Sequence, residues 1–322
     1  ATPSAGEAAA FDVAVIGAGV IGSAAAAYAA GAGATTVLLE QHHFLHRRGS
    51  SHGESRITRY SYPSAMYTKW MRAAFAEWRR WEALTGMHVY NRTGGIDLLP
   101  AGSTTLSRLL AACDAEGVPY ELLTDADAVA TRFGVRLDAD MHCVYQADTG
   151  TLHATTSTSM FQAAALRFGA VLWDHAQVVR YAAVPGGGGY RVHLADGRSV
   201  TAKRVVLACG PWAQPMLREL AGIAIPDAAL QVVQCTVMYF KRKATAAAAA
   251  APTLPVVISY GTTQAWTSAV HEGSATAASH EAVAASSVSS DGDLFYSCPA
   301  VELPGLVKFA VHKGIATTAE TR

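Results

Sequence analysis

Two arginines lie three residues apart in the segment 49–59, which reads GSSHGESRITR and also carries two glycines, three serines and a histidine. The segment begins nine residues after Glu40, an acid at the end of a predicted strand. A guanidinium group is permanently charged and its fork matches a carboxylate, so Arg56 and Arg59 predict a site for an anionic partner. That partner would be an electron-rich ring or a small acid substrate.

The same segment has a second interpretation that involves no ligand. Ser51 and Glu54 match a capping box that opens a short helix, and the two arginines would then lie one turn apart on a solvated face. Taken by itself the segment favours this interpretation, because short motifs recur by chance. The elements that would position the arginines therefore decide the matter.

Residues 11–40 predict a strand, a glycine-rich turn, an alanine-rich helix and a second strand. In this context Gly17 permits the tight turn, Gly19 lets the backbone approach a pyrophosphate, and Gly22 lets the helix pack close to the strand. The amino terminus of the helix offers free N–H groups and a positive dipole. Glu40 would accept the ribose hydroxyls, which favours the adenosine diphosphate part of FAD or NAD over NADP.

The rest of the chain predicts further helices and a strand meander. The predicted helices are 63–85, with an apolar stripe that includes Met66, Tyr67, Trp70, Phe75 and Trp81, and 106–115. The predicted strands are 95–99, 178–184, 190–194, 205–208, 294–297 and 306–311. Residues 244–252 and 274–290 are rich in alanine or serine without apolar periodicity and are expected to be mobile insertions.

Composition bounds the class of protein. A chain of 322 residues with 51% apolar residues is long enough for two globular domains. Its 25 lysines and arginines balance 25 acids, which does not favour nucleic acid or an anionic membrane as partner. No stretch is long and apolar enough to predict a membrane span.

Cysteines and histidines give two further expectations. The five cysteines are scattered without a CxxC motif, which indicates reduced thiols and a cytoplasmic location. The last residues, 320–322, match no peroxisomal signal. His42, His43 and His46 lack the partnered cysteines or carboxylates that a metal site needs, so no metal is expected.

The order of these parts resembles the FAD-dependent amine oxidases of the sarcosine oxidase and pipecolate oxidase family. The resemblance rests on the first strand–helix–strand unit, the segment 49–59, the aromatic helix, ACGPW at 208–212 and GLVKFAVH at 305–312. It implies an α/β (α+β) fold. A Rossmann-like FAD-binding domain would comprise 11–90 and 152–227, interleaved with an antiparallel-sheet substrate domain of 91–151 and 228–315.

The resemblance also implies residue roles. Gly17, Gly19, Gly22 and Glu40 would hold the adenosine half of FAD, with main-chain contacts from Val178 to adenine. Ser50, Ser51 and His52 would line the flavin, and Gly210 and Trp212 lie where the chain passes the cofactor. Arg56 would lie against the isoalloxazine and Arg59 would pair with the substrate carboxylate. Lys308 would hold a water over the flavin and assist oxygen reduction, and Tyr296 and His312 would line the amine site. On the sequence alone, Lys308 and His312 could instead form a solvated strand edge, because residues four apart on a strand share one face.

The activity implied by the resemblance is oxidation of a small secondary or cyclic amino acid, such as sarcosine or pipecolate. A hydride passes to FAD, and O2 then takes the electrons to give H2O2. The expected partners are the amino acid and O2, the expected state is a monomer, and the family leaves a peroxisomal location open.

Relatives continue into a carboxyl-terminal segment with a flavin-linking cysteine, a second lysine and a glycine-rich loop. This chain shows none of these, and Cys298 comes too early to be that cysteine, so FAD is expected to bind non-covalently. One alternative is a truncated, catalytically inactive dinucleotide-binding protein. Another is an NAD-linked dehydrogenase, which the segment 49–59 disfavours because nicotinamide enzymes would continue alternating strands and helices there.

Overall fold

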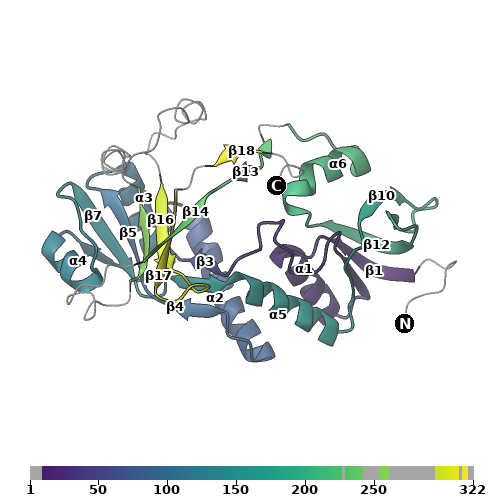
Figure 1. Cartoon of the computed structure of the whole chain (residues 1–322), viewed down its shortest axis with the longest axis horizontal. Helices are drawn as coiled ribbons and strands as arrows, with labels where there is room; N and C mark the ends of the chain where they lie inside the picture. Colours follow the sequence, from purple (N-terminus) through teal and green to yellow (C-terminus); the bar gives the residue numbers. More distant parts are fainter. Residues whose placement is uncertain (1–8, 227–228, 242–253, 261–293, 312–313, 318–322) are drawn as a thin grey trace.

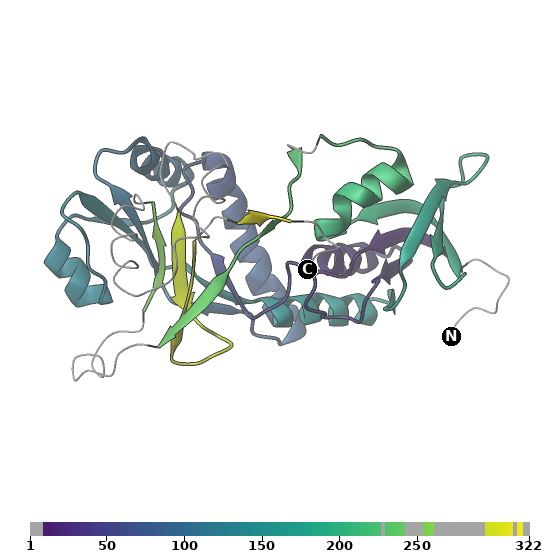
Figure 2. The same cartoon turned by 45° about the horizontal axis from the view of Figure 1, so that its top comes forward.

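The computed structural model describes residues 9–226, 229–241, 254–260, 294–311 and 314–317. The predicted insertions at 244–252 and 274–290 lie outside these residues, as does His312. The molecule is elongated, with one sheet at each end (Figure 1). Turning the molecule keeps the two sheets at opposite ends (Figure 2).

The first sheet has six strands in the order β10-β11-β12-β1-β2-β9. Its strands are β1 Ala9–Ile16, β2 Thr36–Leu39, β9 Val171–Trp173, β10 Val178–Ala183, β11 Tyr190–Leu194 and β12 Ser199–Leu207. The strands β12, β1, β2 and β9 run parallel, and β10 and β11 complete an antiparallel meander. The predicted Rossmann-like start and the meander are confirmed, whereas β9 was not predicted.

Helices cover this sheet, and their amino termini lie at its carboxyl edge. They are α1 Val20–Gly31, α5 Ala154–Arg167 and α6 Ala213–Ala221, with a 3-10 turn at Gly210–Trp212. The helices α1 and α5 share a buried cluster with β1 and β2, which includes Ala26 and Ala30 of α1 and Met160 of α5. A Cβ on Gly22 would lie 1.8 Å from the carbonyl oxygen of Gly17, so only glycine allows α1 to pack this close to the turn.

The second sheet has seven strands in the order β14-β17-β16-β15-β5-β7-β6. Its strands are β5 Gly95–Pro100, β6 Glu121–Leu123, β7 Met141–Gln146, β14 Val237–Lys241, β15 Val256–Ser259, β16 Phe295–Pro299 and β17 Leu306–Val311. Every neighbouring pair is antiparallel except β15 and β5. The predicted antiparallel sheet therefore contains one parallel pair. The helices α3 Thr104–Glu116 and α4 Ala126–Phe133 each share a buried cluster with it.

A small sheet joins the two ends of the molecule. It has the order β3-β8-β4, with β3 Ser55–Thr58, β4 Tyr90–Arg92 and β8 Gly150–His153. The short strands β13 Val233–Gln234 and β18 Ile315–Ala316 form a separate pair. The predicted domain boundaries near 90 and 151 fall inside β4 and β8, and these boundaries stay a prediction.

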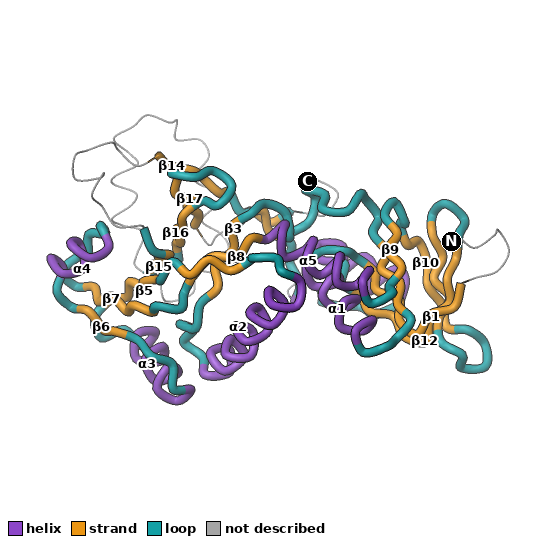
Figure 3. Tube along the Cα trace, turned by 90° about the horizontal axis from the view of Figure 1, so that it is seen from below, coloured by secondary structure: helices purple, strands orange, loops and turns teal. Residues whose placement is uncertain are grey.

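The helix α2, Ala65–Thr85, lies between α3 and α5 (Figure 3). Phe75 and Trp81 are buried, as the apolar stripe predicts. The prediction is wrong for the first turns, where Met66, Tyr67 and Trp70 are 49%, 47% and 59% exposed. There the rings of Tyr67 and Trp70 pack on each other, with their centres 5.7 Å apart. Because both side chains are exposed, helical spacing of aromatic residues does not show that all of them belong to the core.

The alternative of a short helix at Ser51–Glu54 is also wrong. Residues 53–54 form a bend and β3 follows, paired with β8, so Arg56 lies on a strand. None of the helices within the described residues combines the length and apolarity needed to cross a bilayer.

Candidate functional site

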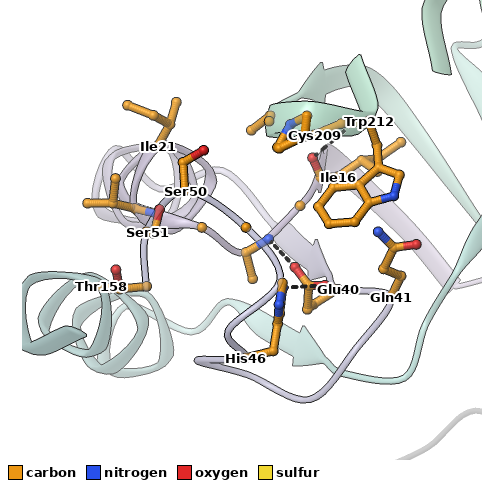
Figure 4. A pocket seen from close by; sticks show the side chains of 18 of the residues that line it. Ile16, Ile21, Glu40, Gln41, His46, Ser50, Ser51, Thr158, Cys209 and Trp212 are labelled. Atoms are coloured by element: carbon orange, nitrogen blue, oxygen red, sulfur yellow. Dashed lines mark hydrogen bonds and ion pairs between the residues drawn. The ribbon is translucent and has the colours of Figure 1, made fainter. Parts of the chain in front are cut away.

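A cleft of about 850 Å³ opens where β1, β2 and β12 end. Ligands of open α/β sheets bind at this edge, because loops and helix amino termini gather there. Its lining includes Gly17, Gly19, Glu40, Ser50, Ser51, His52, Val178, Gly210 and Trp212, which are all the predicted cofactor residues except Gly22. Figure 4 shows how Glu40, Ser51 and Trp212 surround this space.

The glycine turn leaves the amino terminus of α1 open to the cleft. Gly17 has φ +99°, which other residues rarely adopt, and a Cβ there would lie 2.5 Å from the carbonyl oxygen of Ala208. Gly19 is extended, and a Cβ on it would meet only Ser51, at 3.1 Å from Oγ. The turn thus fits a diphosphate, since space and N–H donors coincide at a helix amino terminus.

Glu40 is buried, 5% exposed, at the end of β2. Its Oε2 accepts a hydrogen bond from the Ala18 nitrogen at 2.8 Å, and its Oε1 accepts one from the His42 nitrogen at 3.0 Å. His46 Nε2 lies 3.3 Å from Oε1. A carboxylate has about four acceptor positions, so Glu40 can still accept from a ribose hydroxyl.

Arg56 brings a cation to the wall of the cleft. Its guanidinium donates to the carbonyl oxygens of Ser55, Ser50 and His52 at 2.8, 2.6 and 2.7 Å. These bonds fix the turn that contains the three predicted flavin-lining residues, Ser50, Ser51 and His52. Within the part of the chain that the structure describes, no carboxylate forms an ion pair with Arg56, so its charge remains available to an anionic ligand.

Arg59 lies outside the lining of the cleft, beside the second sheet, and is 9% exposed. Its Nη1 donates to Asp97 Oδ1 at 2.6 Å and to the Tyr260 hydroxyl at 2.8 Å, and its guanidinium carbon lies 4.6 Å from the centre of the Tyr62 ring. Burial raises the pKa of the Asp97 carboxyl, and the charge of Arg59 opposes that rise. Burial acts against the Arg59 cation, but the Asp97 carboxylate raises the pKa of Arg59 above its ordinary value. The two groups therefore form a buried ion pair.

Lys308 lies on β17 and is 6% exposed, which rules out the alternative of a solvated edge. Its Nζ donates to the carbonyl oxygen of Ser55 at 3.2 Å and lies 3.5 Å from Oε1 of Glu302. Glu302 also accepts hydrogen bonds from the hydroxyls of Ser55 and Tyr239. Burial opposes ionisation of Glu302, but these hydrogen bonds lower its pKa to about 2. Lys308 is thus held next to β3 by a carboxylate that stays charged at neutral pH.

Tyr296, on β16, lies outside the lining of the cleft, and burial raises its pKa. The structure therefore places the predicted residues in two groups. The cofactor residues and Arg56 gather at the cleft, whereas Arg59, Lys308 and Tyr296 belong to the second sheet or to the segment that contacts it.

Sequence reasoning missed two parts of the cleft. One is the start of α5, where Thr155 and Thr158 line the cleft and the Thr155 hydroxyl donates to the carbonyl oxygen of Gly53 at 3.0 Å. No motif marks this helix. The other is His46, which was considered only as a metal ligand. Its place six residues after Glu40 was the available signal.

Comparison with known proteins agrees with this geometry. Residues 12–272 match the family model described as DAO, FAD dependent oxidoreductase. The chain is 30% identical over 307 residues to a probable sarcosine oxidase of Arabidopsis thaliana, covering 94% of this chain and 66% of that protein. It is 28% identical over 313 residues to the peroxisomal sarcosine oxidase of Mus musculus, covering 97% of this chain and 71% of that protein. The chain thus spans about two thirds of the length of these relatives.

Solved structures show the same fold. NikD, an unusual amino acid oxidase essential for nikkomycin biosynthesis, superposes with a TM-score of 0.70 at 21% identity, over 98% of this chain and 73% of NikD. The L-proline dehydrogenase of P. horikoshii superposes with a TM-score of 0.69 at 18% identity, over 96% of this chain and 71% of that chain. With most of its length matched by the family model, the chain belongs to the DAO family of FAD-dependent oxidoreductases.

Proposed function

We propose that the chain binds FAD in the cleft and oxidises a small secondary or cyclic amino acid, such as sarcosine or pipecolate. One observation carries the proposal: the segment 49–59 contacts both the cleft and the second sheet. Ser51 meets α1 at the cleft, while Arg59 pairs with Asp97 of β5. A single stretch of chain therefore fixes a dinucleotide site and a buried cation relative to each other.

Each residue would have a defined task. FAD would supply the two-electron acceptor, which takes a hydride from the carbon next to nitrogen and passes the electrons to O2 to give H2O2. Glu40 would accept from the ribose, and the first turn of α1 would face the diphosphate. Arg56 would place its charge beside the ring system, where it stabilises developing negative charge.

Arg59 would bind the substrate carboxylate. Among the described residues, its hydrogen bonds to Asp97 and Tyr260 all leave from Nη1. The rest of the guanidinium fork remains for a carboxylate, which it matches in geometry. Lys308 would provide a second cation, and its charge would favour electron transfer to O2. Loss of the hydride would convert the neutral amine into an iminium ion, which would release a proton to water, and a second water molecule would hydrolyse the resulting imine.

We propose that FAD is held without a covalent bond. Among the described cysteines, Cys209 is the one that lines the cleft, and its Sγ lies 3.6 Å from the carbonyl oxygen of Ile16. Burial raises the pKa of Cys209 to about 11, so the thiol stays protonated and poorly reactive. Acid precipitation of the loaded protein should release the flavin into the supernatant, and flavin that stays with the pellet would contradict the proposal.

Two further expectations stay predictions. They are a monomeric state, which analytical ultracentrifugation tests, and a cytoplasmic location, which imaging of the tagged protein in its host tests.

The experiment that tests the proposed function uses protein reconstituted with FAD. A visible flavin band should appear, and anaerobic addition of sarcosine or L-pipecolate should bleach it, with peroxide formed once air is admitted. Flavin binding without bleaching by either amino acid would favour a catalytically inactive dinucleotide-binding protein. A parallel fluorescence titration with NADH tests the alternative of an NAD-linked dehydrogenase. Such an enzyme would bind NADH and show no affinity for FAD.

A further inference from the structure

His46 lies against Glu40 at the wall of the cleft and uses both nitrogens of its ring. Its Nε2 lies 3.3 Å from Oε1 of Glu40, a contact drawn as a dashed line in Figure 4. Its Nδ1 accepts a hydrogen bond from the backbone nitrogen of Arg48 at 3.0 Å. A neutral imidazole has one donor and one acceptor nitrogen. Because Nδ1 accepts, Nε2 must carry the proton and donate it to Glu40.

Neighbouring rings hold the imidazole in this orientation. The ring of His42 packs edge to face against that of His46, with 4.8 Å between their centres, and contacts the ring of Trp212 at 5.9 Å. Burial lowers the pKa of His46, which favours the neutral ring that this pair of hydrogen bonds requires. The hydrogen bond from the Arg48 nitrogen thus sets the tautomer of His46, and the packing of His42 holds the orientation of its ring.

Two side-chain acceptors bind backbone N–H groups here, one in the glycine turn and one at the start of α1. Glu40 accepts from the Ala18 nitrogen at 2.8 Å, and the Ser51 hydroxyl accepts from the Val20 nitrogen at 3.0 Å. Glu40 begins the loop that ends at Ser51. His46 lies between them in the chain and bonds to both Glu40 and the backbone at Arg48, three residues before Ser51.

We propose that His46 is a positioning residue for the adenosine diphosphate end of the cleft: it ties the Glu40 carboxylate to the loop that carries Ser51, so that both acceptors hold their places around the helix amino terminus. The inference rests on the proposed binding of FAD and adds a residue that acts through Glu40 and Ser51. Its ligand class is any adenosine diphosphate compound with a free ribose diol.

The test measures dissociation constants of FAD and of ADP for wild-type protein and four variants. His46→Ala removes both hydrogen bonds and should raise both dissociation constants about tenfold, the effect of about one hydrogen bond of ordinary net strength. His46→Gln keeps a donor near the position of Nε2, and His46→Asn keeps an acceptor near that of Nδ1. Each should recover part of the loss, to about threefold above wild type.

His193→Ala is the matched control. His193 lies on β11, outside the lining of the cleft, so its removal should change affinity less than about twofold. Comparing ADP with 2′-deoxy-ADP tests whether His46 acts through Glu40, because Glu40 would bind the ribose hydroxyls. The loss in His46→Ala should shrink for the deoxy compound. Nitrogen-15 NMR of the ligand-free protein should show His46 with its proton on Nε2.

Several outcomes would overturn the inference while leaving the proposed function intact. They are His46→Ala binding ADP as tightly as wild type, a loss for FAD without a loss for ADP, or a proton on Nδ1 at neutral pH. Wild-type protein that binds neither FAD nor ADP would instead overturn the proposed function. Thermal unfolding of each ligand-free variant separates lost affinity from lost folding.

Discussion

The Ser51 hydroxyl lies 3.0 Å from the backbone nitrogen of Val20 and accepts its hydrogen bond. This contact brings the segment 49–59 to the first turn of α1. A helix leaves its first N–H groups without partners inside the helix. The Ser51 hydroxyl, from a different part of the chain, is the acceptor for one of these groups. The glycine turn and the arginine-containing segment are therefore parts of one site.

Ser51→Ala should lower the free energy of unfolding of the cofactor-free protein by about 1 kcal/mol, the usual effect of removing a side chain that caps a helix. Urea titration measures it. Ser50→Ala is the control, because only the carbonyl oxygen of Ser50 forms a hydrogen bond among the described residues. Equal losses in both variants would show that the Ser51 contact does not support α1.

Asp97→Asn should lower the free energy of unfolding by about 3 kcal/mol, because Arg59 would keep a buried charge without its counter-ion. Glu121→Gln provides the comparison. Its exposed pair with Arg132 should contribute less than about 1 kcal/mol. The account of a buried ion pair would be contradicted by denaturant midpoints that shift equally in the two variants.

Arg59→Lys keeps a positive charge beside Asp97 but removes the fork. The FAD-loaded variant should bind acetate or another small carboxylate about tenfold more weakly, as expected when a two-pronged contact becomes a single one. Its affinity for FAD should not change, since Arg59 lies outside the lining of the cleft. Spectral titration with acetate measures the first affinity and a fluorescence titration with FAD measures the second. Unchanged acetate affinity would remove Arg59 from the substrate site.

Glu302 should make stability depend on pH in the acid range. Its pKa in the folded protein is about 2, below the ordinary value of 4.5, so the unfolded chain binds more protons between these values. The contribution is full above pH 4.5 and is lost as the pH falls towards 2. Glu302→Gln should therefore destabilise the protein at pH 7 and differ less from wild type at pH 3. A gap that stays constant with pH would contradict this.

Much of the fold could be predicted from local patterns. The run ending at Ile16, the glycine turn and Glu40 follow a spacing that requires no long-range information, and the structure confirms them. The strand β9 is only three residues long and carries no alternation, so its pairing with β2 depends on tertiary contacts alone. The helix α2 was predicted from local spacing, but the exposure of the apolar residues in its first turns was not. Helical spacing does not show which part of a long helix packs against the rest of the protein.

The candidate site was predictable to a similar degree. Most of the site residues predicted in the fingerprint and in the segment 49–59 line the cleft, whereas Gly22 and Arg59 do not. They could be predicted because their types and spacing are typical of a dinucleotide site. Asp97 and Glu302 were not found, because a single acid on a strand or in a turn has no motif. Their roles become visible only when folding brings each within reach of a cation from another element.

The central claim is that the glycine turn receives the diphosphate of FAD, and a fluorescence titration of FAD tests it most directly. Gly19 has an extended backbone that valine can adopt, and its Cβ would meet only Ser51, so Gly19→Val should fold yet fill the space before α1. Gly188→Val, in the hairpin turn after β10, is the matched control, because a Cβ there has no atom closer than 3.9 Å. We expect one FAD per wild-type chain, control affinity equal to wild type, and a dissociation constant raised at least about a hundredfold by Gly19→Val. Wild-type protein that does not bind FAD, or a folded Gly19→Val variant that binds it as tightly as wild type, would contradict the claim.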